Sequence, residues 1–196
     1  REYRVIHALN QTDFPVPRAY LLCEDERVIG TAFFLMSHVA GHARADVSMP
    51  DLTPAGRTQL AASYVDTLAR LHTLDHVALG LGDFGPPGNY FARQVARWSR
   101  QWESSRTREN PALDRLLAWL PGHVPEGDET VVCHGDFHPL NVIVSPAGAT
   151  VVDWTAARLG PPAFDVAFTA LLLAHPPIAV GPALARGPAR LRRRGR

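Results

Sequence analysis

Three short apolar runs between residues 131 and 153 constrain the fold of this chain more than any other feature. They cover Val131–Cys133, Val142–Val144 and Val151–Val152. Each run is rich in valine and is bounded by turn residues, which is typical of short buried strands. A turn at Ser145–Gly148 separates the last two runs. We therefore expect the segment His134–Asn141 to be a loop that leaves the end of a strand.

Polar residues are concentrated in this loop and at the strand ends. His134, Asp136 and Asn141 lie in the loop, and Asp153 directly follows the last run. Carboxylate and amide oxygens suit Mg²⁺, which is usually held by one or two carboxylates together with phosphate groups. In phosphoryl transfer the protein mainly positions groups and neutralises charge. The residue types therefore favour a phosphoryl-transfer site.

The segment HGDFHPLN at residues 134–141, followed by Asp153, resembles the catalytic loop and the metal-binding aspartate of protein kinases. It is more similar still to the aminoglycoside phosphotransferase family of kinase-like enzymes. The resemblance implies an α+β, protein-kinase-like two-lobe fold and the ATP- and Mg²⁺-dependent phosphorylation of a small-molecule hydroxyl. It implies that Asp136 accepts the hydroxyl proton, and that Asn141 and Asp153 hold Mg²⁺ on ATP. His134 is then a structural anchor of the loop.

The resemblance covers nearly the whole chain. LARLH at residues 68–72, with the later LGDFGPPGNYFARQVARWSRQW, is similar to kinase-like domains related to those fused to acyl-CoA dehydrogenases. By the same resemblance, Asp165 supports the catalytic loop and Glu2 matches a helix glutamate that pairs with a strand lysine. Backbone groups of Ser37, His38 and Val39 would contact adenine. From the residues alone, Glu2 also fits an exposed acid at a helix end, and the 37–39 segment a plain core strand.

Two features depart from the kinase pattern. The triplet Asp83-Phe84-Gly85 spells the kinase metal-binding motif, but it precedes the catalytic loop by about 50 residues, so we expect a surface loop there. All 20 basic residues other than histidine are arginines. The strand lysine that holds the ATP phosphates in kinase-like enzymes is therefore not in this chain.

Two other interpretations stay open. A zinc or di-metal hydrolase would use Cys133, His134, Asp136 and His138, whose close spacing is permissible for transition metals. The hydrolase interpretation gives no role to Asn141 or to Asp153. The second is a non-catalytic, kinase-like binding module, because the chain lacks the phosphate-binding lysine and a Gly-rich loop.

Four classes of acceptor are compatible with the resemblance. They are an aminoglycoside, a hydroxylated acyl compound, a sugar and an amino alcohol. All are small molecules that carry a hydroxyl group. The subgroup resemblance points toward the acyl compounds.

Local patterns predict the other elements. We expect a helix over 1–9, strands at 19–23 and 31–39, and an amphipathic helix from Pro54 to about His72. A short helix over 111–120 is expected to turn four leucines inward, and Trp98 to pack with Tyr90 and Val95 on one helix face. A last helix is expected to run to about Ala174.

The resemblance implies two lobes, and the charge of the last residues sets a tail apart from them. Residues 1–38 are expected to be the remnant of a truncated N-terminal, nucleotide-binding lobe, 39–178 the mostly helical C-terminal catalytic lobe, and 179–196 a basic, disordered tail with six arginines and no acid. A basic tail can touch nucleic acid, but we expect a solvated tail and no nucleic-acid partner. No apolar run approaches a membrane span, and the two cysteines indicate thiols in a reducing cytosol, so we expect a cytoplasmic protein.

Overall fold

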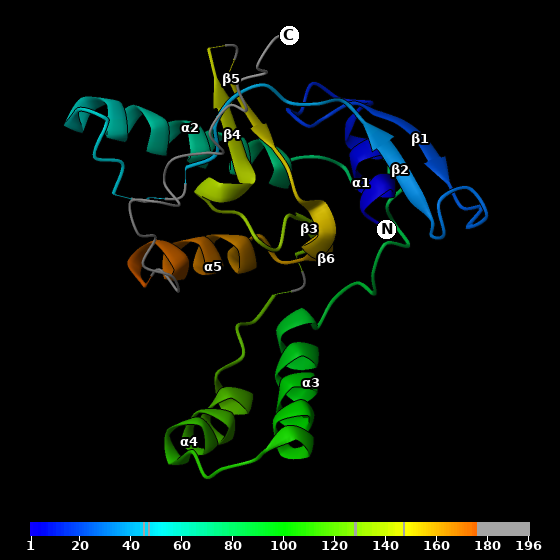
Figure 1. Cartoon of the computed structure of the whole chain (residues 1–196). Coiled ribbons are helices and arrows are strands. Elements are labelled where there is room, and N and C mark those ends of the chain that lie inside the picture. The colour runs from blue at the N-terminus through cyan, green and yellow to red at the C-terminus, as the bar shows by residue number, and fades with distance from the viewer. Residues whose placement is uncertain (45, 47, 128, 147, 176–196) are drawn as a thin grey trace, which may run out of the picture.

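The computed structural model describes residues 1–44, 46, 48–127, 129–146 and 148–175. Its helices are combined with three two-stranded antiparallel sheets, which is the mixed α+β architecture predicted (Figure 1). The expected basic tail at 179–196 and the end of the predicted C-terminal lobe lie outside the described residues.

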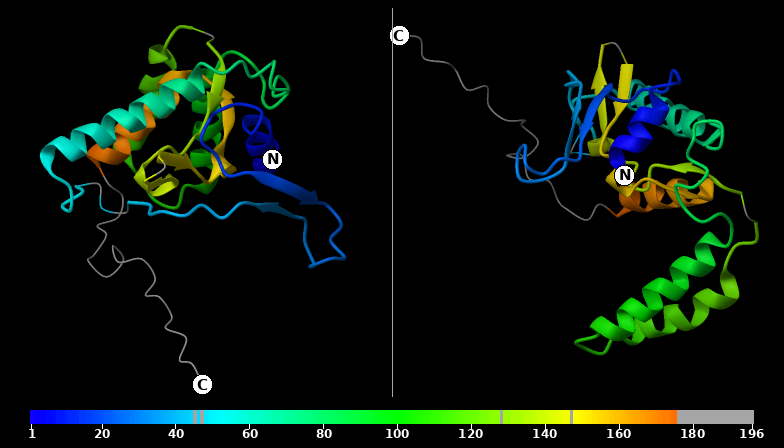
Figure 2. Two further views of the ribbon diagram at one scale, coloured as in Figure 1. Left: turned by 90° about the horizontal axis from the view of Figure 1, so that it is seen from above. Right: turned by 90° about the vertical axis from the view of Figure 1, so that its right-hand side faces the viewer.

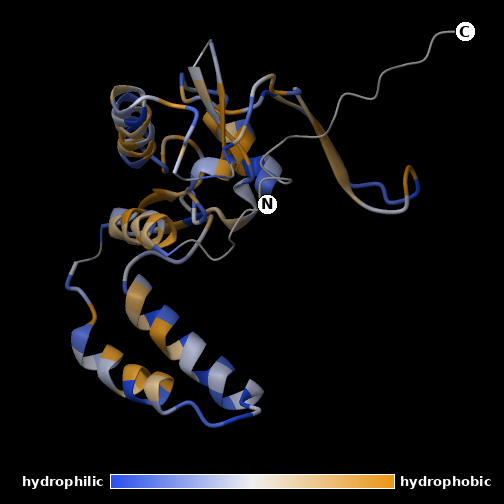
Figure 3. Ribbon diagram, turned by 60° about the vertical axis from the view of Figure 1, so that its left-hand side comes forward, coloured by the Kyte–Doolittle hydropathy of each residue, from blue (hydrophilic) through white to orange (hydrophobic). Residues whose placement is uncertain are grey.

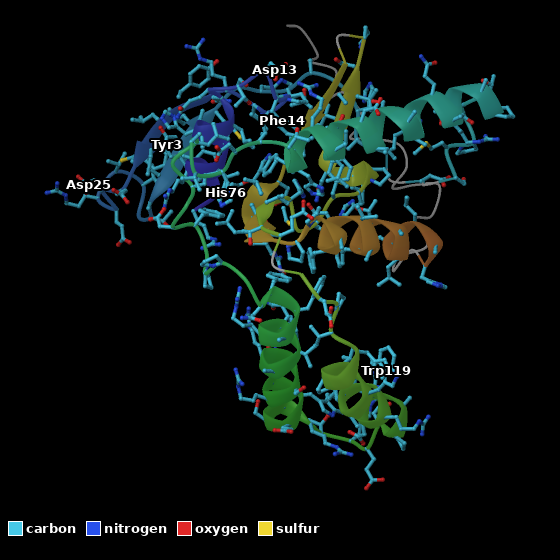
Figure 4. The ribbon with its side chains drawn as sticks, turned by 180° about the vertical axis from the view of Figure 1, so that it is seen from behind. Tyr3, Asp13, Phe14, Asp25, His76 and Trp119 are labelled. Atoms are coloured by element: carbon cyan, nitrogen blue, oxygen red, sulfur yellow. The ribbon has the colours of Figure 1, made fainter. Side chains whose placement is uncertain are left out.

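The N-terminal part consists of one helix and one hairpin. Helix α1 (Glu2–Leu9) buries Val5, Ile6, Ala8 and Leu9. Strands β1 (Ala19–Cys23) and β2 (Phe33–Met36) pair antiparallel, so the second strand is shorter than the 31–39 segment predicted. Tyr3 of α1 packs edge-on against Phe34 of β2 (Figure 4). This hairpin leaves several large apolar side chains exposed, among them Tyr20, Leu21, Leu35 and Met36.

Helix α2 (Pro54–His72) matches the predicted amphipathic helix. Thr53 caps it, because its Oγ1 accepts a hydrogen bond from the Gly56 amide at 3.1 Å. Tyr64 and Leu68 are buried, and Leu71 is fully buried. The inner face of α2 therefore forms one wall of the core, as the spacing predicts.

The predicted strand runs form two separate pairs. Strand β4 (Val142–Ser145) pairs with β5 (Gly148–Val151), whereas β3 (Val131–Cys133) pairs with β6 (Arg158–Gly160). Strand β6 was not expected from the sequence, because RLG carries no strand pattern of its own. Helix α5 (Pro162–Ala174) follows directly and packs against β3.

Helices α3 (Tyr90–Ser105) and α4 (Pro111–Trp119) project from the body as a hairpin (Figures 1 and 2). Asp114 joins them, because it accepts hydrogen bonds from Trp102 Nε1 at 3.3 Å and Arg106 Nη2 at 2.9 Å. No residue of α4 is fully buried: Leu116 is exposed, whereas Leu113 and Leu117 are partly buried, so the predicted inward packing is met only in part. Trp98 is also more than half exposed, since α3 meets the body only near its first turn.

The core lies between α1, α2 and the two strand pairs, away from the α3–α4 hairpin. Figure 3 shows that α5 is largely apolar, whereas α3 mixes polar and apolar residues along its length. The side chains at the centre of the core come from α1, the end of α2, strands β3, β4 and β5, and the loops between these elements: Ile6, Leu9, Leu71, Leu81, Val132, Phe137, Val142, Val151 and Trp154. Among the described residues, no helix is both long and apolar enough to cross a membrane.

Candidate active site

The loop after β3 turns sharply at Gly135, which has a φ of +84°. A Cβ atom built at this position would lie 2.3 Å from the carbonyl oxygen of Ala156. Only glycine accepts both this backbone conformation and so close an approach. The segment after Asp153 is therefore packed directly against the loop that carries Asp136.

The carboxylate of Asp165 holds the start of this loop. It is fully buried, and its two oxygens accept the amides of His134 and Gly135, each at 2.8 Å. His72 Nε2 lies 3.0 Å from the same carboxylate, so the end of α2 also contacts this group. The resemblance assigned loop support to Asp165, whereas the sequence analysis gave His72 no contact with this carboxylate. The LARLH motif was the available signal for His72.

His134 ties the loop to the strand end before Asp153. Its Nε2 lies 3.1 Å from the carbonyl oxygen of Val152, and its Nδ1 accepts the Asp136 amide at 3.3 Å. Because a carbonyl can only accept, the ring proton lies on Nε2. Burial lowers the pKa of His134, which favours the neutral ring. These contacts support an anchoring role rather than proton transfer.

Asp136 lies at the mouth of the loop with its side chain 37% exposed. Asn141 Nδ2 donates to Asp136 Oδ2 at 3.0 Å and to the Asp136 carbonyl oxygen at 2.9 Å. His138 Nε2 lies 3.3 Å from Asp136 Oδ1. From the sequence, His138 is expected to have a role only as a ligand in the zinc alternative, so this contact is new. Both carboxylate oxygens are thus oriented while one edge of the group stays open.

Asn141 and Asp153 lie at the same end of the β4–β5 hairpin. The ladder pairs Val142 with Val151, and the Val152 amide donates to the Asn141 carbonyl oxygen at 2.9 Å. Asp153 therefore follows the partner of Asn141 directly. The Asn141 side-chain oxygen accepts no hydrogen bond from the described residues, which leaves it available as a ligand.

Asp153 has a left-handed backbone, with φ +61°, which is uncommon for a residue other than glycine. Its Oδ1 accepts the Thr155 hydroxyl at 2.6 Å and caps the short helix η3 (Trp154–Ala156). Glu2 Oε1 accepts the next amide, that of Trp154, at 3.1 Å. The helix glutamate is therefore directed at the Asp153 loop, and the side chain of Asp153 remains exposed.

The other site predictions fall in different parts of the molecule. The Ser37 amide donates to the Arg18 carbonyl at 2.8 Å, and Ser37 Oγ accepts the Arg18 amide at 2.9 Å. His38 and Val39 follow beyond the end of β2. Asp83 of the kinase-like triplet is an exposed residue paired with Arg4, as expected of a surface loop.

The four residues of the zinc alternative do not converge. The Cys133 thiol lies 3.4 Å from the Gly160 carbonyl, and burial raises its pKa. His134 faces a backbone carbonyl, whereas His138 faces Asp136. A different trio, His72, Cys133 and Asp165, is close enough to hold a metal ion, but its carboxylate already accepts the loop amides. The structure therefore offers no support for a zinc site built on Cys133.

The family model described as the phosphotransferase enzyme family matches residues 1–196. The chain belongs to this family. It is 40% identical over 174 residues to mouse acyl-CoA dehydrogenase family member 10, a match that covers 87% of this chain and 16% of that protein. The rat family member 11 is 38% identical over 180 residues, covering 90% of this chain and 23% of the relative. The chain thus spans less than a quarter of the curated relatives.

Solved structures agree with the family and the fold. A candidate aminoglycoside phosphotransferase of Ralstonia eutropha JMP134 superposes with a TM-score of 0.84 at 43% identity, covering 92% of this chain and 55% of that one. The kinase-like fold and the family resemblance drawn from the sequence are therefore confirmed. The domain boundaries and the roles of single residues stay predictions.

Proposed function

We propose that this protein transfers a phosphoryl group from ATP to a hydroxyl group of a small molecule. The observation that carries the proposal is the convergence of Asp136, Asn141 and Asp153 at one end of the β4–β5 hairpin. Family membership supports the reaction class. The residues match the needs of phosphoryl transfer, which depends on positioning and on charge neutralisation.

Asp136 is the proposed base that accepts the proton of the acceptor hydroxyl. The hydrogen bond from Asn141 Nδ2 fixes its carboxylate, and its partial exposure leaves room for an acceptor. The fixed orientation matters because a base must lie within hydrogen-bond reach of the proton it removes. His138 would hold the second carboxylate oxygen.

The oxygens of Asn141 and Asp153 fit Mg²⁺, because both are hard donors and the Asn141 side-chain oxygen is free of partners among the described residues. The ion would neutralise charge on the ATP phosphates. Thr155 and Glu2 would position this side of the site by holding the Asp153 carboxylate and the Trp154 amide.

Adenine contacts are proposed for the segment after β2. The Ser37 amide is engaged by Arg18, so the backbone groups of His38 and Val39 are the better candidates. Both residues precede His42, whose bridge to Val144 ties this segment to the β4–β5 hairpin.

Cytosolic location stays a prediction, which the free thiols of Cys23 and Cys133 support.

A non-catalytic binding module is the second candidate. One observation favours it: the chain has no lysine to bind the ATP phosphates. Glu2, the expected partner of that lysine, instead accepts a hydrogen bond from the Trp154 amide. On this alternative the fold would bind a nucleotide or a metabolite without turnover.

The decisive experiment is turnover of the Asp136→Asn variant. ADP release is measured with Mg·ATP and a panel of hydroxylated acceptors. Loss of a general base is expected to lower the rate by about 10²–10⁴-fold, while the exposed Asp83→Asn control keeps its activity. Equal turnover in Asp136→Asn and the control would refute the assigned base, and no turnover in the wild type would favour the binding module.

A further inference from the structure

A cavity of about 420 Å³ opens beside the predicted catalytic loop. Arg1, the first turns of α3 and the segment that leads into β6 form its walls, and Figure 1 shows the N-terminus and α3 converging on β6. Among the described residues that line it are four arginines and no carboxylate. The arginines are Arg1, Arg93, Arg97 and Arg158.

Among the residues that the structure describes, the hydrogen-bond partners of these guanidinium groups are all neutral. Arg158 donates to the Ala156 carbonyl at 2.9 Å and to the Tyr90 hydroxyl at 3.0 Å. Arg1 Nη2 donates to the Phe84 carbonyl at 3.1 Å, and Arg93 Nη2 to the Pro86 carbonyl at 2.9 Å.

Other arginines of the chain behave differently. Five of them form ion pairs with aspartates: Arg4, Arg27, Arg44, Arg70 and Arg106. None of the four cavity arginines forms an ion pair with a described carboxylate. Of the acids nearest in sequence to the lining residues, Asp83 pairs with Arg4, Glu2 accepts the Trp154 amide, and Asp153 accepts the Thr155 hydroxyl. Several positive charges therefore face one cavity without an ion-pair partner in the described part of the chain.

The cavity borders the predicted site on two sides. Arg158 Nε lies 3.0 Å from the position that a Cβ atom of Gly135 would take, one residue before Asp136. Thr155 lines the cavity and donates its hydroxyl to Asp153. An anion in the cavity would thus lie next to both the proposed base and the proposed metal ligand.

We propose that this cavity binds a phosphate group, and that the acceptor is a hydroxyl compound that carries one. The inference rests on the proposed phosphotransfer function and names its acceptor class. Guanidinium groups bind phosphate through paired, charge-assisted hydrogen bonds, and four of them suit a dianion better than a single carboxylate. The same charges disfavour a polycationic acceptor such as an aminoglycoside.

The first test measures binding of inorganic phosphate. Melting curves are recorded in sodium phosphate and in sodium chloride of equal ionic strength, for wild type, Arg97→Gln and Arg100→Gln. Arg97 is chosen because its side chain forms no hydrogen bond with a described backbone group. An Arg158 variant would also lose the hydrogen bonds to Ala156 and Tyr90. Arg100 is exposed on the same helix and does not line the cavity, so it is the matched control.

Phosphate is expected to stabilise the wild type and Arg100→Gln by several degrees. Loss of one charge-assisted contact should raise the phosphate dissociation constant of Arg97→Gln about tenfold. Equal phosphate affinity in the two variants, or no stabilisation of the wild type, would overturn the site. Asp153→Ala should keep the phosphate response while losing any response to Mg·ATP, so this proposal and the proposed function can fail separately.

A second test separates a phosphorylated acceptor from free phosphate. ADP release is compared for pairs of alcohols that differ only in a phosphate group. Preferential turnover of the phosphorylated members, with a KM that rises in Arg97→Gln but not in Arg100→Gln, assigns the cavity to the acceptor. Turnover confined to the unphosphorylated members would overturn that assignment and leave free phosphate as the occupant.

Discussion

Asp83 and Asp153 each precede a buried aromatic residue, yet the surroundings of the two carboxylates differ completely. Asp83 precedes Phe84 in an exposed loop, and Asp153 precedes Trp154 at the end of the β4–β5 hairpin. The hydrogen bond from the Arg4 guanidinium lowers the pKa of Asp83 and pairs its charge. Asp153 has instead a left-handed backbone and a hydroxyl donor in Thr155.

The residues that surround each aspartate in space distinguish Asp83 from Asp153 better than the local sequence does. Val152, the residue before Asp153, is hydrogen-bonded to His134 and to Asn141, which are the first and last residues of the predicted catalytic loop. The described contacts of Asp83 lead only to Arg4 on the surface of α1. A metal-binding triplet therefore indicates a site only where the fold brings other oxygen ligands beside it.

Among the changes near Asp136 and Asp153, removal of the Asp165 carboxylate is expected to lower the free energy of unfolding most. Asp165→Ala leaves the amides of His134 and Gly135 buried without partners, and each such group costs about 1–3 kcal/mol. We expect a loss of about 3 kcal/mol in the free energy of unfolding, measured by urea denaturation.

The matched control is Asp83→Ala, which removes an exposed ion pair. Its urea midpoint should stay close to that of the wild type, because such pairs contribute little. If both variants lost the same stability, the two regions would not differ as described.

Two glycines sharpen the comparison further. Gly135→Ala places a Cβ atom 2.3 Å from the Ala156 carbonyl at a positive φ, whereas at Gly85 the nearest atom lies 3.8 Å away. We expect Gly135→Ala to cost about 2 kcal/mol in unfolding free energy, since left-handed strain alone costs about 1–3 kcal/mol. Gly85→Ala should be nearly neutral, and a larger loss there than at Gly135 would argue against the close packing of the loop.

The smallest predicted effect is a pH dependence that originates at His134. Because burial lowers its pKa, the folded protein binds fewer protons at this residue than the unfolded chain does. Stability is then full above the unfolded pKa of about 6.5 and falls as the pH drops below it, by at most about 1.4 kcal/mol per pH unit. An NMR titration should place the His134 pKa below its ordinary value, and a value above it would contradict the neutral anchor.

The sequence predicts the β4–β5 hairpin and the loop before it well, because their signals are local. The valine runs, the turn residues and the spacing of Asp136, Asn141 and Asp153 all lie within one short segment. Helix α2 is also predicted, since its apolar residues recur at a regular spacing.

Other features depend on tertiary partners that leave no local pattern. Strand β6 forms because Arg158–Gly160 pairs with β3, and His72 reaches Asp165 across 93 positions of the chain. The leucines of α4 recur at helical spacing, but the helix lies in the projecting α3–α4 hairpin, away from the hydrophobic core. Figure 4 shows Trp119 of α4 on this hairpin. Periodicity predicts an apolar face, but a second surface must be present to bury it.

The most direct test of the predicted magnesium–nucleotide site is a thermal melt with and without Mg·ATP, on wild type, Asp153→Ala and Asp83→Ala. A ligand at 100 times its Kd stabilises a protein by about 2.7 kcal/mol, which is a shift of several degrees. We expect a Mg²⁺-dependent shift in the wild type and in Asp83→Ala, and its loss in Asp153→Ala. An equal shift in both variants would contradict the assignment of Asp153, and with it the central claim that this hairpin end holds the metal-bound nucleotide.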